Sequence, residues 1–198
     1  MTALVHIVDD DEAIRDALSF LLGTHGLANR CWHSGEQFLL DYRDSMRGCI
    51  VLDVRMSGMT GPECFDVLRG RGCRMPVIFL TGHGDVPLAV EVLRAGACHF
   101  IEKPPHEAQL LAAVREALQR DIEIQESYDA RNQLGERLRQ LSPREREVMD
   151  LILDGKLNKQ IADILQISMR TVEVHRSNIF DKMAVRSAVE LAGLLAKN

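Results

Sequence analysis

The stretch VHIVDDDEAIR, residues 5–15, places four consecutive acidic side chains directly after a short apolar run. Two carboxylates about 4 Å apart repel each other by about 4 kcal/mol at an effective dielectric constant near 20. Such a cluster persists cheaply only where water solvates it or a cation neutralises it. Asp11 and Glu12 can be explained as caps of a following helix, whose N-terminus favours acids. Asp9 and Asp10 need another explanation.

The change from an apolar run to a helical pattern recurs along residues 5–103. Apolar runs lie at 5–8, 30–33, 49–53, 77–81 and 99–102, and helical patterns lie at 13–23, 35–42, 62–70, 86–96 and 109–120. Five strands alternating with five helices predict a parallel sheet covered on both faces. Glycines at 23, 70 and 96 are placed as helix C-caps. The predicted fold is a doubly wound, five-stranded α/β domain.

Polar side chains end four of the predicted strands. Asp9 and Asp10, then Asp53, Thr81 and Lys103 follow successive apolar runs. Open α/β sheets bind ligands beyond the carboxyl ends of their strands, so we expect these side chains to converge. A lone Asp at a strand end is usually a turn residue and a lone Lys is usually solvated. Four strands that all end in matching chemistry are a much rarer coincidence.

This set of residues suits phosphate chemistry. Three clustered carboxylates favour Mg²⁺, which takes few protein ligands and keeps waters for a phosphate. Asp53 stands apart from the acidic pair and is positioned as a nucleophile, since aspartates form acyl phosphates. Mg²⁺ and Lys103 would offset the charge of the phosphoryl oxygens, and the Thr81 hydroxyl would donate a hydrogen bond to one of them.

The remainder of the chain reads as helical. Residues 121–139 are polar, lack proline and are rich in helix formers, which predicts a helical linker over a disordered tether. Within it and just beyond, Leu134, Leu138 and Leu141 have a spacing too short to assert a coiled coil. Ser142, Pro143 and Glu145 make a good helix start, and further helices are predicted at 158–167, 168–183 and 186–198. Four short helices with a tight turn between the second and third fit helix-turn-helix geometry.

Composition and charge narrow the class of protein without deciding it. The net charge is −5 over 198 residues, but residues 140–198 carry 9 basic and 8 acidic side chains, which leaves DNA binding open. No apolar run reaches membrane-spanning length, and the N-terminus lacks the pattern of a signal peptide. The five cysteines form no CxxC motif and the seven histidines show no ligand-like clustering. Reduced thiols in a cytoplasmic protein are favoured over disulfides or a metal site.

Residues 4–120 resemble the receiver domain of bacterial two-component response regulators, which is flavodoxin-like. The acidic pair, DVRMSGMTG (53–61), LTGHGD (80–85) and FIEKP (100–104) match the family's landmarks in order and spacing. The resemblance implies that Asp53 accepts phosphate from a sensor histidine kinase. It implies Mg²⁺ ligation by Asp10, Asp53 and the main-chain carbonyl of Arg55, with Asp9 acting through water. Thr81 and Phe100 would form a switch pair, although Phe100 taken alone reads as core packing.

Two positions depart from the family. Ser57 stands where the family usually has proline, so the loop after Asp53 is expected to be less rigid. Pro105 stands where an apolar side chain is commoner. We expect neither departure to touch the chemistry. The family also implies a cis peptide bond between Lys103 and Pro104, which the small trans preference of X–Pro bonds permits.

Residues 140–198 resemble the LuxR-type helix-turn-helix, and the two domains together resemble a regulator of the NarL/FixJ family. GHGDVP (82–87) and TVEVHR (171–176) favour the FixJ branch. By this resemblance the helix that begins near Met169 enters the major groove. The expected DNA-binding residues are Val174, His175, Ser177 and Asn178 toward bases, Lys159, Thr171, Arg176 and Lys182 toward phosphates, and Arg170. Glu173 replaces a base-contacting lysine of some relatives.

The sequence therefore predicts a DNA-binding response regulator with domains at 1–120 and 140–198 and a linker at 121–139. Its expected partners are a sensor histidine kinase, promoter DNA, a second copy on phosphorylation and RNA polymerase, but no membrane. We expect no enzyme beyond slow self-catalysed phosphorylation and dephosphorylation. Two alternatives remain open. One is a phosphate-independent interaction module, and the other is a Mg²⁺-dependent phosphatase of the haloacid-dehalogenase type that uses Asp9 and Asp11.

Overall fold

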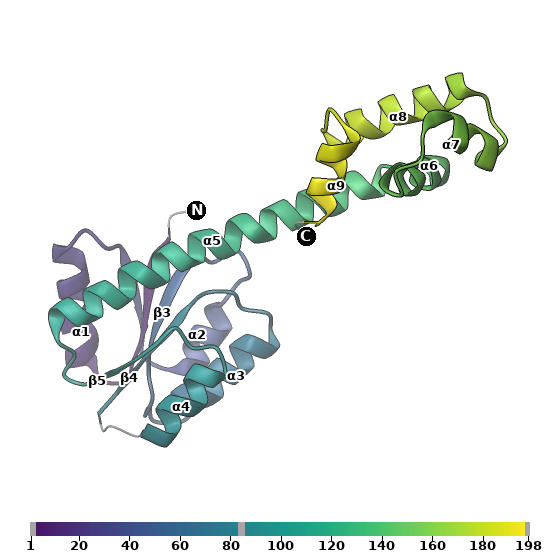
Figure 1. The fold of residues 1–198 in the computed structure, drawn as a ribbon. Coiled ribbons are helices and arrows are strands. Elements are labelled where there is room, and N and C mark those ends of the chain that lie inside the picture. The colour runs from purple at the N-terminus through teal and green to yellow at the C-terminus, as the bar shows by residue number, and fades with distance from the viewer. Residues whose placement is uncertain (1–2, 83–85, 197–198) are drawn as a thin grey trace. The chain divides into compact units, whose positions relative to one another are not determined.

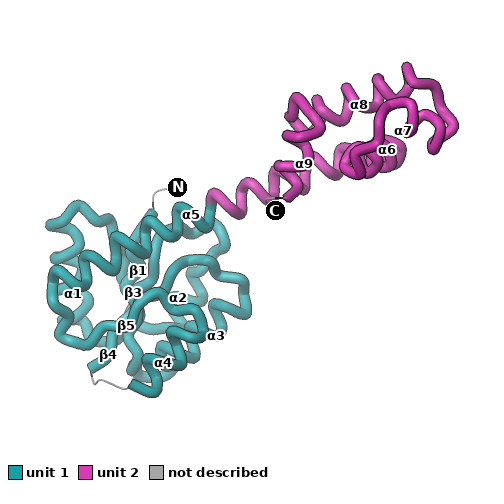
Figure 2. Tube along the Cα trace, in the orientation of Figure 1, with its two compact units in different colours: residues 1–125 teal, residues 126–198 magenta. Residues whose placement is uncertain are grey.

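The computed structural model describes residues 3–82 and 86–196. The chain divides into two compact units, residues 1–125 and 126–198, which Figure 2 shows in different colours. Residues 83–85 of the predicted GHGDVP motif and the last two residues of the predicted C-terminal helix lie outside the described part.

The first unit is built on the predicted parallel sheet, with strand order β2-β1-β3-β4-β5. Every neighbouring pair of strands is parallel, and Ile7 of β1, for example, lies between Cys31 and Val51. The doubly wound fold is confirmed. The elements are β1 (Leu4–Val8), α1 (Glu12–Thr24), β2 (Asn29–Trp32), α2 (Gly35–Asp41), β3 (Gly48–Asp53), α3 (Gly61–Gly70), β4 (Val77–Thr81), α4 (Val86–Arg94), β5 (His99–Glu102) and α5 (Glu107–Arg139).

Two apolar clusters cover the two faces of this sheet. Alternate residues of β3 point to opposite faces, so Ile50 and Leu52 join one cluster and Cys49 and Val51 the other. The first cluster contains buried side chains of α2, α3 and α4, and the second those of α1 and α5. Figure 1 shows these helices on the two sides of the sheet. Burial on both faces explains why the strands read as continuous apolar runs.

Glycines do end helices, although not all at the predicted positions. Gly23 and Gly70 lie inside α1 and α3, and the backbone turns into the positive-φ region two or three residues later, at Gly26 (φ 71°) and Gly72 (φ 76°). Gly96 has φ 103° and follows α4, as expected for a glycine beyond a helix end. The sequence pattern thus predicts that a helix ends in this region, but it does not predict at which residue the helix ends.

The second unit is helical, as predicted. Its helices after α5 are α6 (Pro143–Leu153), α7 (Asn158–Leu165), α8 (Met169–Met183) and α9 (Ala188–Ala196). The Ser142 hydroxyl accepts from Glu145 N and the Glu145 carboxylate accepts from Ser142 N, so the predicted capping box at the start of α6 is present. Gln166 ends α7 in the left-handed region at φ 53°, and Ser168 caps α8 two residues later. This is the tight turn of a helix-turn-helix.

The predicted linker is helical throughout, and its two ends belong to different cores. Asp121 is 3% exposed and its carboxylate lies 2.9 Å from the Arg47 guanidinium, inside the first unit. Leu134 and Leu141 are buried in the core of the second unit, with Leu138 packed against it. The leucine spacing that resembled a heptad fragment therefore reflects packing within the second unit. Among the described residues, no helix is long and apolar enough to cross a membrane.

Candidate functional site

The predicted side chains do converge at the carboxyl edge of the sheet. Asp53 and Thr81 are the last residues of β3 and β4, Asp9 directly follows β1, and Lys103 directly follows β5. The Lys103 ammonium nitrogen lies 2.6 Å from Asp9 Oδ2 and 2.8 Å from Asp53 Oδ1. One cation from the fifth strand thus joins carboxylates from the first and the third.

Burial makes these charges interact strongly. Asp9 is 1% exposed and Asp53 is 5% exposed. Burial raises the pKa of Asp53, because desolvation outweighs the opposing effect of Lys103. Desolvation alone would lower the pKa of Lys103, but its hydrogen bonds to Asp53 and Asp9 together raise it above the ordinary value. An ionised lysine is therefore held beside a carboxylate whose proton affinity is increased.

Asp10 has a different environment from Asp9 and Asp53. It is exposed, and its Oδ2 accepts a hydrogen bond of 2.7 Å from the main-chain N–H of Ser57. That bond is the main cause of a lowered pKa at Asp10. Proline has no N–H, so the residue usual in the family could not make this contact. The Ser57 departure therefore adds a main-chain contact to one of the three carboxylates, and our expectation that it leaves the chemistry untouched stays a prediction.

The loop that follows Asp53 is held close to the strand. Gly61 begins α3 and its N–H donates to the carbonyl of Val54 at 3.0 Å. A Cβ at Gly61 would lie 2.2 Å from the Asp53 carbonyl oxygen, so only glycine permits this approach. The loop is also tied by Glu36 Oε1, which accepts from Met59 N at 2.8 Å. These contacts hold the main chain of the loop that follows Asp53, which includes the exposed residue Arg55.

The three carboxylates fit a divalent cation. One oxygen of each of Asp9, Asp10 and Asp53 lies within 4.8 Å of the others. An all-oxygen, partly exposed donor set is the kind that Mg²⁺ prefers, and Asp10 provides the side open to water. Lys103 contacts one oxygen of Asp9 and one of Asp53, and the other oxygen of Asp9 accepts a hydrogen bond from Asp11 N at 3.0 Å. The residues present therefore match the predicted Mg²⁺ site.

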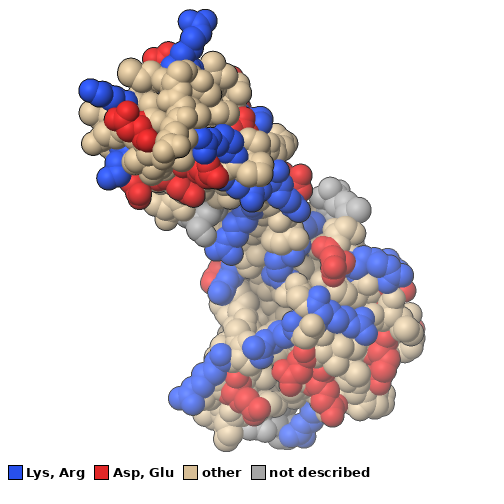
Figure 3. Space-filling model, turned by 90° about the vertical axis from the view of Figure 1, so that its right-hand side faces the viewer, with Lys and Arg blue, Asp and Glu red and all other residues tan. Residues whose placement is uncertain are grey.

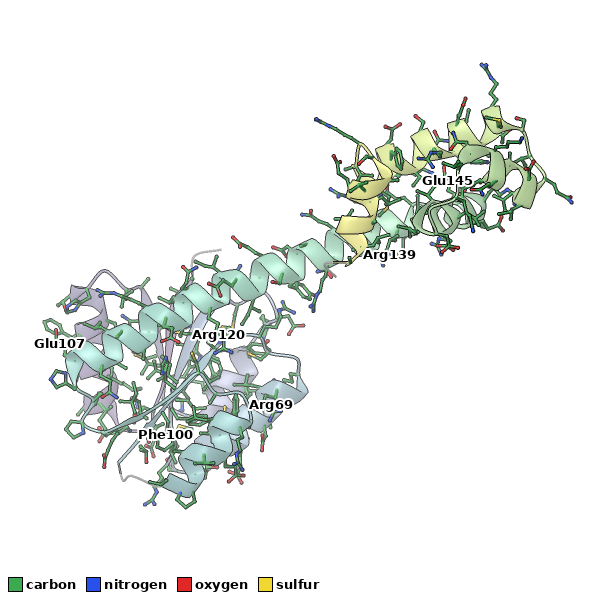
Figure 4. The ribbon with its side chains drawn as sticks, viewed as in Figure 1. Arg69, Phe100, Glu107, Arg120, Arg139 and Glu145 are labelled. Atoms are coloured by element: carbon green, nitrogen blue, oxygen red, sulfur yellow. The ribbon has the colours of Figure 1, made fainter. Side chains whose placement is uncertain are left out.

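Thr81 and Phe100 lie beside this group on β4 and β5. Thr81 is 1% exposed, and its carbonyl accepts from Lys103 N at 2.6 Å. Phe100, labelled in Figure 4, is half-buried and packs against the cluster on the α2, α3 and α4 side of the sheet. The peptide bond between Lys103 and Pro104 is cis, as predicted. The switch roles of Thr81 and Phe100 stay a prediction.

Asp11 is used structurally. Its side chain is the N-cap of α1 and accepts from the N–H groups of Ala13 and Ile14. This confirms the prediction that Asp11 and Glu12 serve the N-terminus of the following helix, since Glu12 lies in the first turn of α1. A phosphatase mechanism that pairs Asp9 with Asp11 would need this capping carboxylate as an acid or base, so the arrangement does not favour it.

The predicted DNA-reading helix is α8. It buries Val172, Ile179 and Met183 against the rest of the second unit. Most of the predicted base-contacting and flanking side chains lie away from that buried stripe; the exposed ones are Arg170, Val174, Ser177 and Asn178, with Lys159 exposed on α7. Thr171 is half-buried and its hydroxyl lies 2.8 Å from that of Ser168. The outward residues form a mainly polar surface, as a major-groove helix requires.

Three of the predicted DNA contacts have intramolecular constraints. The Nδ1 atom of His175 is buried without a hydrogen-bond partner, so only Nε2 remains for a base. The guanidinium of Arg176 lies 5.3 Å from the centre of the Phe180 ring. The Lys182 ammonium lies 2.6 Å from Glu145 Oε2, and Glu145 is 4% exposed. A phosphate contact by Lys182 would have to share or break this ion pair.

Glu145 contacts Lys182, one of the predicted DNA-binding residues, whereas the sequence indicated only that Glu145 caps a helix. The same carboxylate oxygen accepts from Ser142 N and from Lys182, and Lys182 is the main cause of its lowered pKa. Figure 4 shows Glu145 on α6. The surface in view in Figure 3 carries basic and acidic side chains intermixed on both units, which agrees with the small net charge of residues 140–198.

Comparison with known families covers both units. Residues 5–115 match the response regulator receiver domain, and residues 139–195 match the bacterial regulatory proteins of the luxR family. The transcriptional regulatory protein FixJ of Azorhizobium caulinodans is 49% identical over 187 residues, which cover 94% of this chain and 89% of that protein. The C4-dicarboxylate transport transcriptional regulatory protein DctR of Rhodobacter capsulatus is 47% identical and covers 97% of this chain and 98% of its own length.

Solved structures give the same relationship. The response regulator StyR superimposes with a TM-score of 0.94 at 38% identity, over the full length of both chains. Full-length FixJ from B. japonicum superimposes with a TM-score of 0.60 at 37% identity, over 98% of this chain and 96% of its own.

Proposed function

The chain belongs to the two-component transcriptional response regulators that join a receiver domain to a LuxR-type DNA-binding domain, and we propose that Asp53 is its phosphoacceptor. The observation that carries the proposal is the position of Asp53 at the end of β3, 2.8 Å from Lys103 and within 4.8 Å of two further carboxylates. A sensor histidine kinase is the partner that the receiver domain implies.

The proposed reaction transfers one phosphoryl group. A carboxylate oxygen of Asp53 attacks phosphorus, the bond between phosphorus and the donor's imidazole nitrogen breaks, and the nitrogen keeps the electron pair. Lys103 and Thr81 lie where they can stabilise charge on the phosphoryl oxygens. Mg²⁺, when bound, supplies positive charge to those oxygens and offsets the repulsion between carboxylates. Asp10, Asp53 and the Arg55 carbonyl are the proposed ligands, with Asp9 acting through water.

The test of this assignment compares Asp53→Asn with the wild type. Both are incubated with acetyl phosphate and Mg²⁺, and the mass of the intact protein is measured. The wild type should gain one phosphoryl group and Asp53→Asn none. Asp66→Asn, at an exposed position on α3, is the matched control and should behave as the wild type. Equal uptake by Asp53→Asn would refute the assignment.

The metal is tested separately. Asp10 is exposed, so Asp10→Ala should leave the fold intact while removing one of few Mg²⁺ ligands. Saturable Mg²⁺ binding and phosphorylation should both be lost. An unchanged Mg²⁺ titration in this variant would refute the proposed ligand set.

We propose no enzymatic activity toward an external substrate, only slow self-catalysed phosphorylation from small donors and slow dephosphorylation.

Control of DNA binding is proposed to run through dimerisation. Residues 140–198 carry nearly balanced charge, so one copy gains little from phosphate contacts and two linked copies gain more. Symmetric dimers place half-sites about one helical turn apart. Light scattering and footprinting on the full-length protein, with and without beryllofluoride, test this. A beryllofluoride form that stays monomeric yet binds its operator fully excludes the dimerisation mechanism.

The DNA surface itself is proposed to be the exposed face of α8. Asn178→Ala should weaken binding by about 1–3 kcal/mol and relax specificity at one base pair if this side chain reads a base. Asp154→Asn, at an exposed position after α6, is the control.

We further propose that the protein acts in the cytoplasm, where its DNA target lies, and that contact with RNA polymerase follows binding at the promoter.

A further inference from the structure

A second group of metal-ligating side chains lies away from the aspartate site. Cys98 precedes β5, His99 is the first residue of β5, and Glu116 projects from α5. The Cys98 sulfur, a ring nitrogen of His99 and a carboxylate oxygen of Glu116 all lie within 4.8 Å of one another. His99 Nε2 and Glu116 Oε2 are 3.1 Å apart. No CxxC motif or histidine cluster marks this group in the sequence, because Glu116 lies 17 positions after His99.

The donor atoms differ in kind from those of the aspartate site. A thiolate, an imidazole and a carboxylate form a mixed set that suits Zn²⁺, whereas three carboxylates suit Mg²⁺. Tetrahedral Zn²⁺ with bonds of about 2.0–2.3 Å needs ligand atoms about 3.3–3.8 Å apart. The present spread is up to 4.8 Å, so side-chain shifts of about 1 Å close the site. A thiolate and a carboxylate together also balance the charge of a divalent ion.

The surroundings leave the group accessible and adjustable. The side chains of His99 and Glu116 are 31% and 64% exposed. Cys98 is half-buried and, together with Arg120, lines a cavity of about 220 Å³ whose lining does not include His99 or Glu116. Arg120, labelled on α5 in Figure 4, donates from Nη1 to the Cys98 sulfur at 3.9 Å.

We propose that Cys98, His99 and Glu116 bind one Zn²⁺ ion, with water as the fourth ligand. Binding releases the thiol proton, since the thiolate is the ligand. The ion joins α5, in its first third, to the first residue of β5, which is the neighbour of Phe100 in the chain. The pair His25 and Glu107 provides an internal comparison, because its atoms lie at a similar 3.5 Å and no third ligand joins it within residues 3–82 and 86–196.

Co²⁺ is the spectroscopic probe for this proposal, since it takes the place of Zn²⁺ and reports its ligands in the absorption spectrum. The reduced, full-length protein is titrated with Co²⁺ alone. We expect one equivalent to give intense visible bands of four-coordinate Co²⁺ and a near-ultraviolet thiolate-to-cobalt band, both abolished by one equivalent of Zn²⁺. Cys98→Ser should lose the thiolate band, and Glu116→Gln should weaken Co²⁺ binding by about tenfold or more.

Three control variants separate this site from other ligands. Asp10→Ala should keep the thiolate band, which excludes the aspartate site as its origin. Cys31→Ser, at the exposed cysteine, and His25→Ala should also keep it. Circular dichroism establishes that each variant is folded; Glu116 lies on an exposed helix face and provides the second test if Cys98→Ser misfolds. The absence of a thiolate band in the wild type, its persistence in a folded Cys98→Ser variant, or an unchanged Co²⁺ affinity in Glu116→Gln overturns the proposal.

Discussion

The ammonium nitrogen of Lys103 lies 2.8 Å from Asp53 Oδ1, so the cation placed to stabilise a transferred phosphoryl group already neutralises the proposed acceptor. The same nitrogen contacts Asp9 Oδ2 at 2.6 Å. We therefore expect substitution of Lys103 to change both the stability of the unmodified protein and the degree to which Mg²⁺ stabilises it.

Lys103→Met should lower the free energy of unfolding of the first unit by about 3 kcal/mol, because two buried carboxylates lose their shared partner. Saturating Mg²⁺ should stabilise this variant more than the wild type, since the site has one positive charge fewer. Denaturation followed by the fluorescence of Trp32, the one tryptophan of the chain, measures both effects. Lys156→Met, at an exposed lysine, should show neither, and equal Mg²⁺ stabilisation of Lys103→Met and wild type contradicts this account.

Ser57→Pro should raise the pKa of Asp10 toward its ordinary value, because the N–H that stabilises the ionised carboxylate is removed. Ser57→Ala keeps the N–H, which is the largest cause of the lowered pKa of Asp10, and should raise that pKa less than Ser57→Pro does. Carboxyl-carbon NMR titrations in metal-free buffer measure the two variants. Identical titrations of Asp10 in both would show that the main-chain bond has no such effect.

His6 should make the stability of the first unit depend on pH. It is 2% exposed, lies against the Trp32 and Phe38 rings, and its Nε2 is 3.2 Å from the Arg47 carbonyl oxygen. Burial lowers its pKa despite that contact, so the unfolded chain binds a proton more readily than the folded one.

Stability should therefore be fully present above about pH 6.5, the ordinary value for histidine, and fall below it by at most about 1.4 kcal/mol per pH unit. His6→Gln should flatten this slope, as measured by urea unfolding at several pH values. An unchanged slope in His6→Gln assigns the pH dependence to other groups.

Glu145→Gln should destabilise the second unit by about 1–3 kcal/mol, because a buried carboxylate loses charged hydrogen bonds with Lys182 and Ser142. The effect should appear in the helical circular dichroism signal and leave the Trp32 transition unchanged. Since the pKa of Glu145 is lowered, its contribution is present above about pH 4.5 and lost as the pH falls further. Glu147→Gln, which breaks only an exposed pair on the same helix, should cost less than about 1 kcal/mol.

Substitutions of Lys159 and Lys182 should have different effects, one on DNA affinity and the other on the stability of the second unit. Lys159→Ala should reduce the salt dependence of affinity by about one unit of the logarithmic slope, as expected for one lost phosphate contact. Lys182→Met should instead lower the melting temperature of the second unit, because it removes the partner of Glu145. A loss of salt slope in Lys182→Met without a change in melting would reverse this assignment.

The sheet, its order of elements and the convergence of Asp9, Asp53 and Lys103 could be predicted because parallel strands bring their carboxyl ends to one edge. The Ser57 contact could not, because it depends on a main-chain N–H that any residue except proline supplies. The Lys182 ion pair was also hidden, since Glu145 and Lys182 are 37 positions apart and each has a sufficient local explanation.

Helix ends were the weakest part of the fold prediction. Gly23 and Gly70 have the right residue type, but Gly26 and Gly72 lie close by and adopt the turn conformation instead. The local sequence offers two glycines at each place, so residue type alone does not identify the one that adopts the positive-φ conformation.

The division of α5 between two cores decides where the gene can be cut. A fragment that starts at residue 140, the predicted domain boundary, lacks Leu134 and Leu138 and leaves an apolar gap in the helix-turn-helix unit. A receiver fragment that stops at residue 120 likewise lacks Asp121, so the Arg47 guanidinium loses the carboxylate with which it forms an ion pair. Residues 126–133 are all exposed, so a junction in that stretch preserves both sets of contacts. Truncations and domain exchanges between relatives should therefore be joined inside the helix, within those eight residues, rather than at either of its ends.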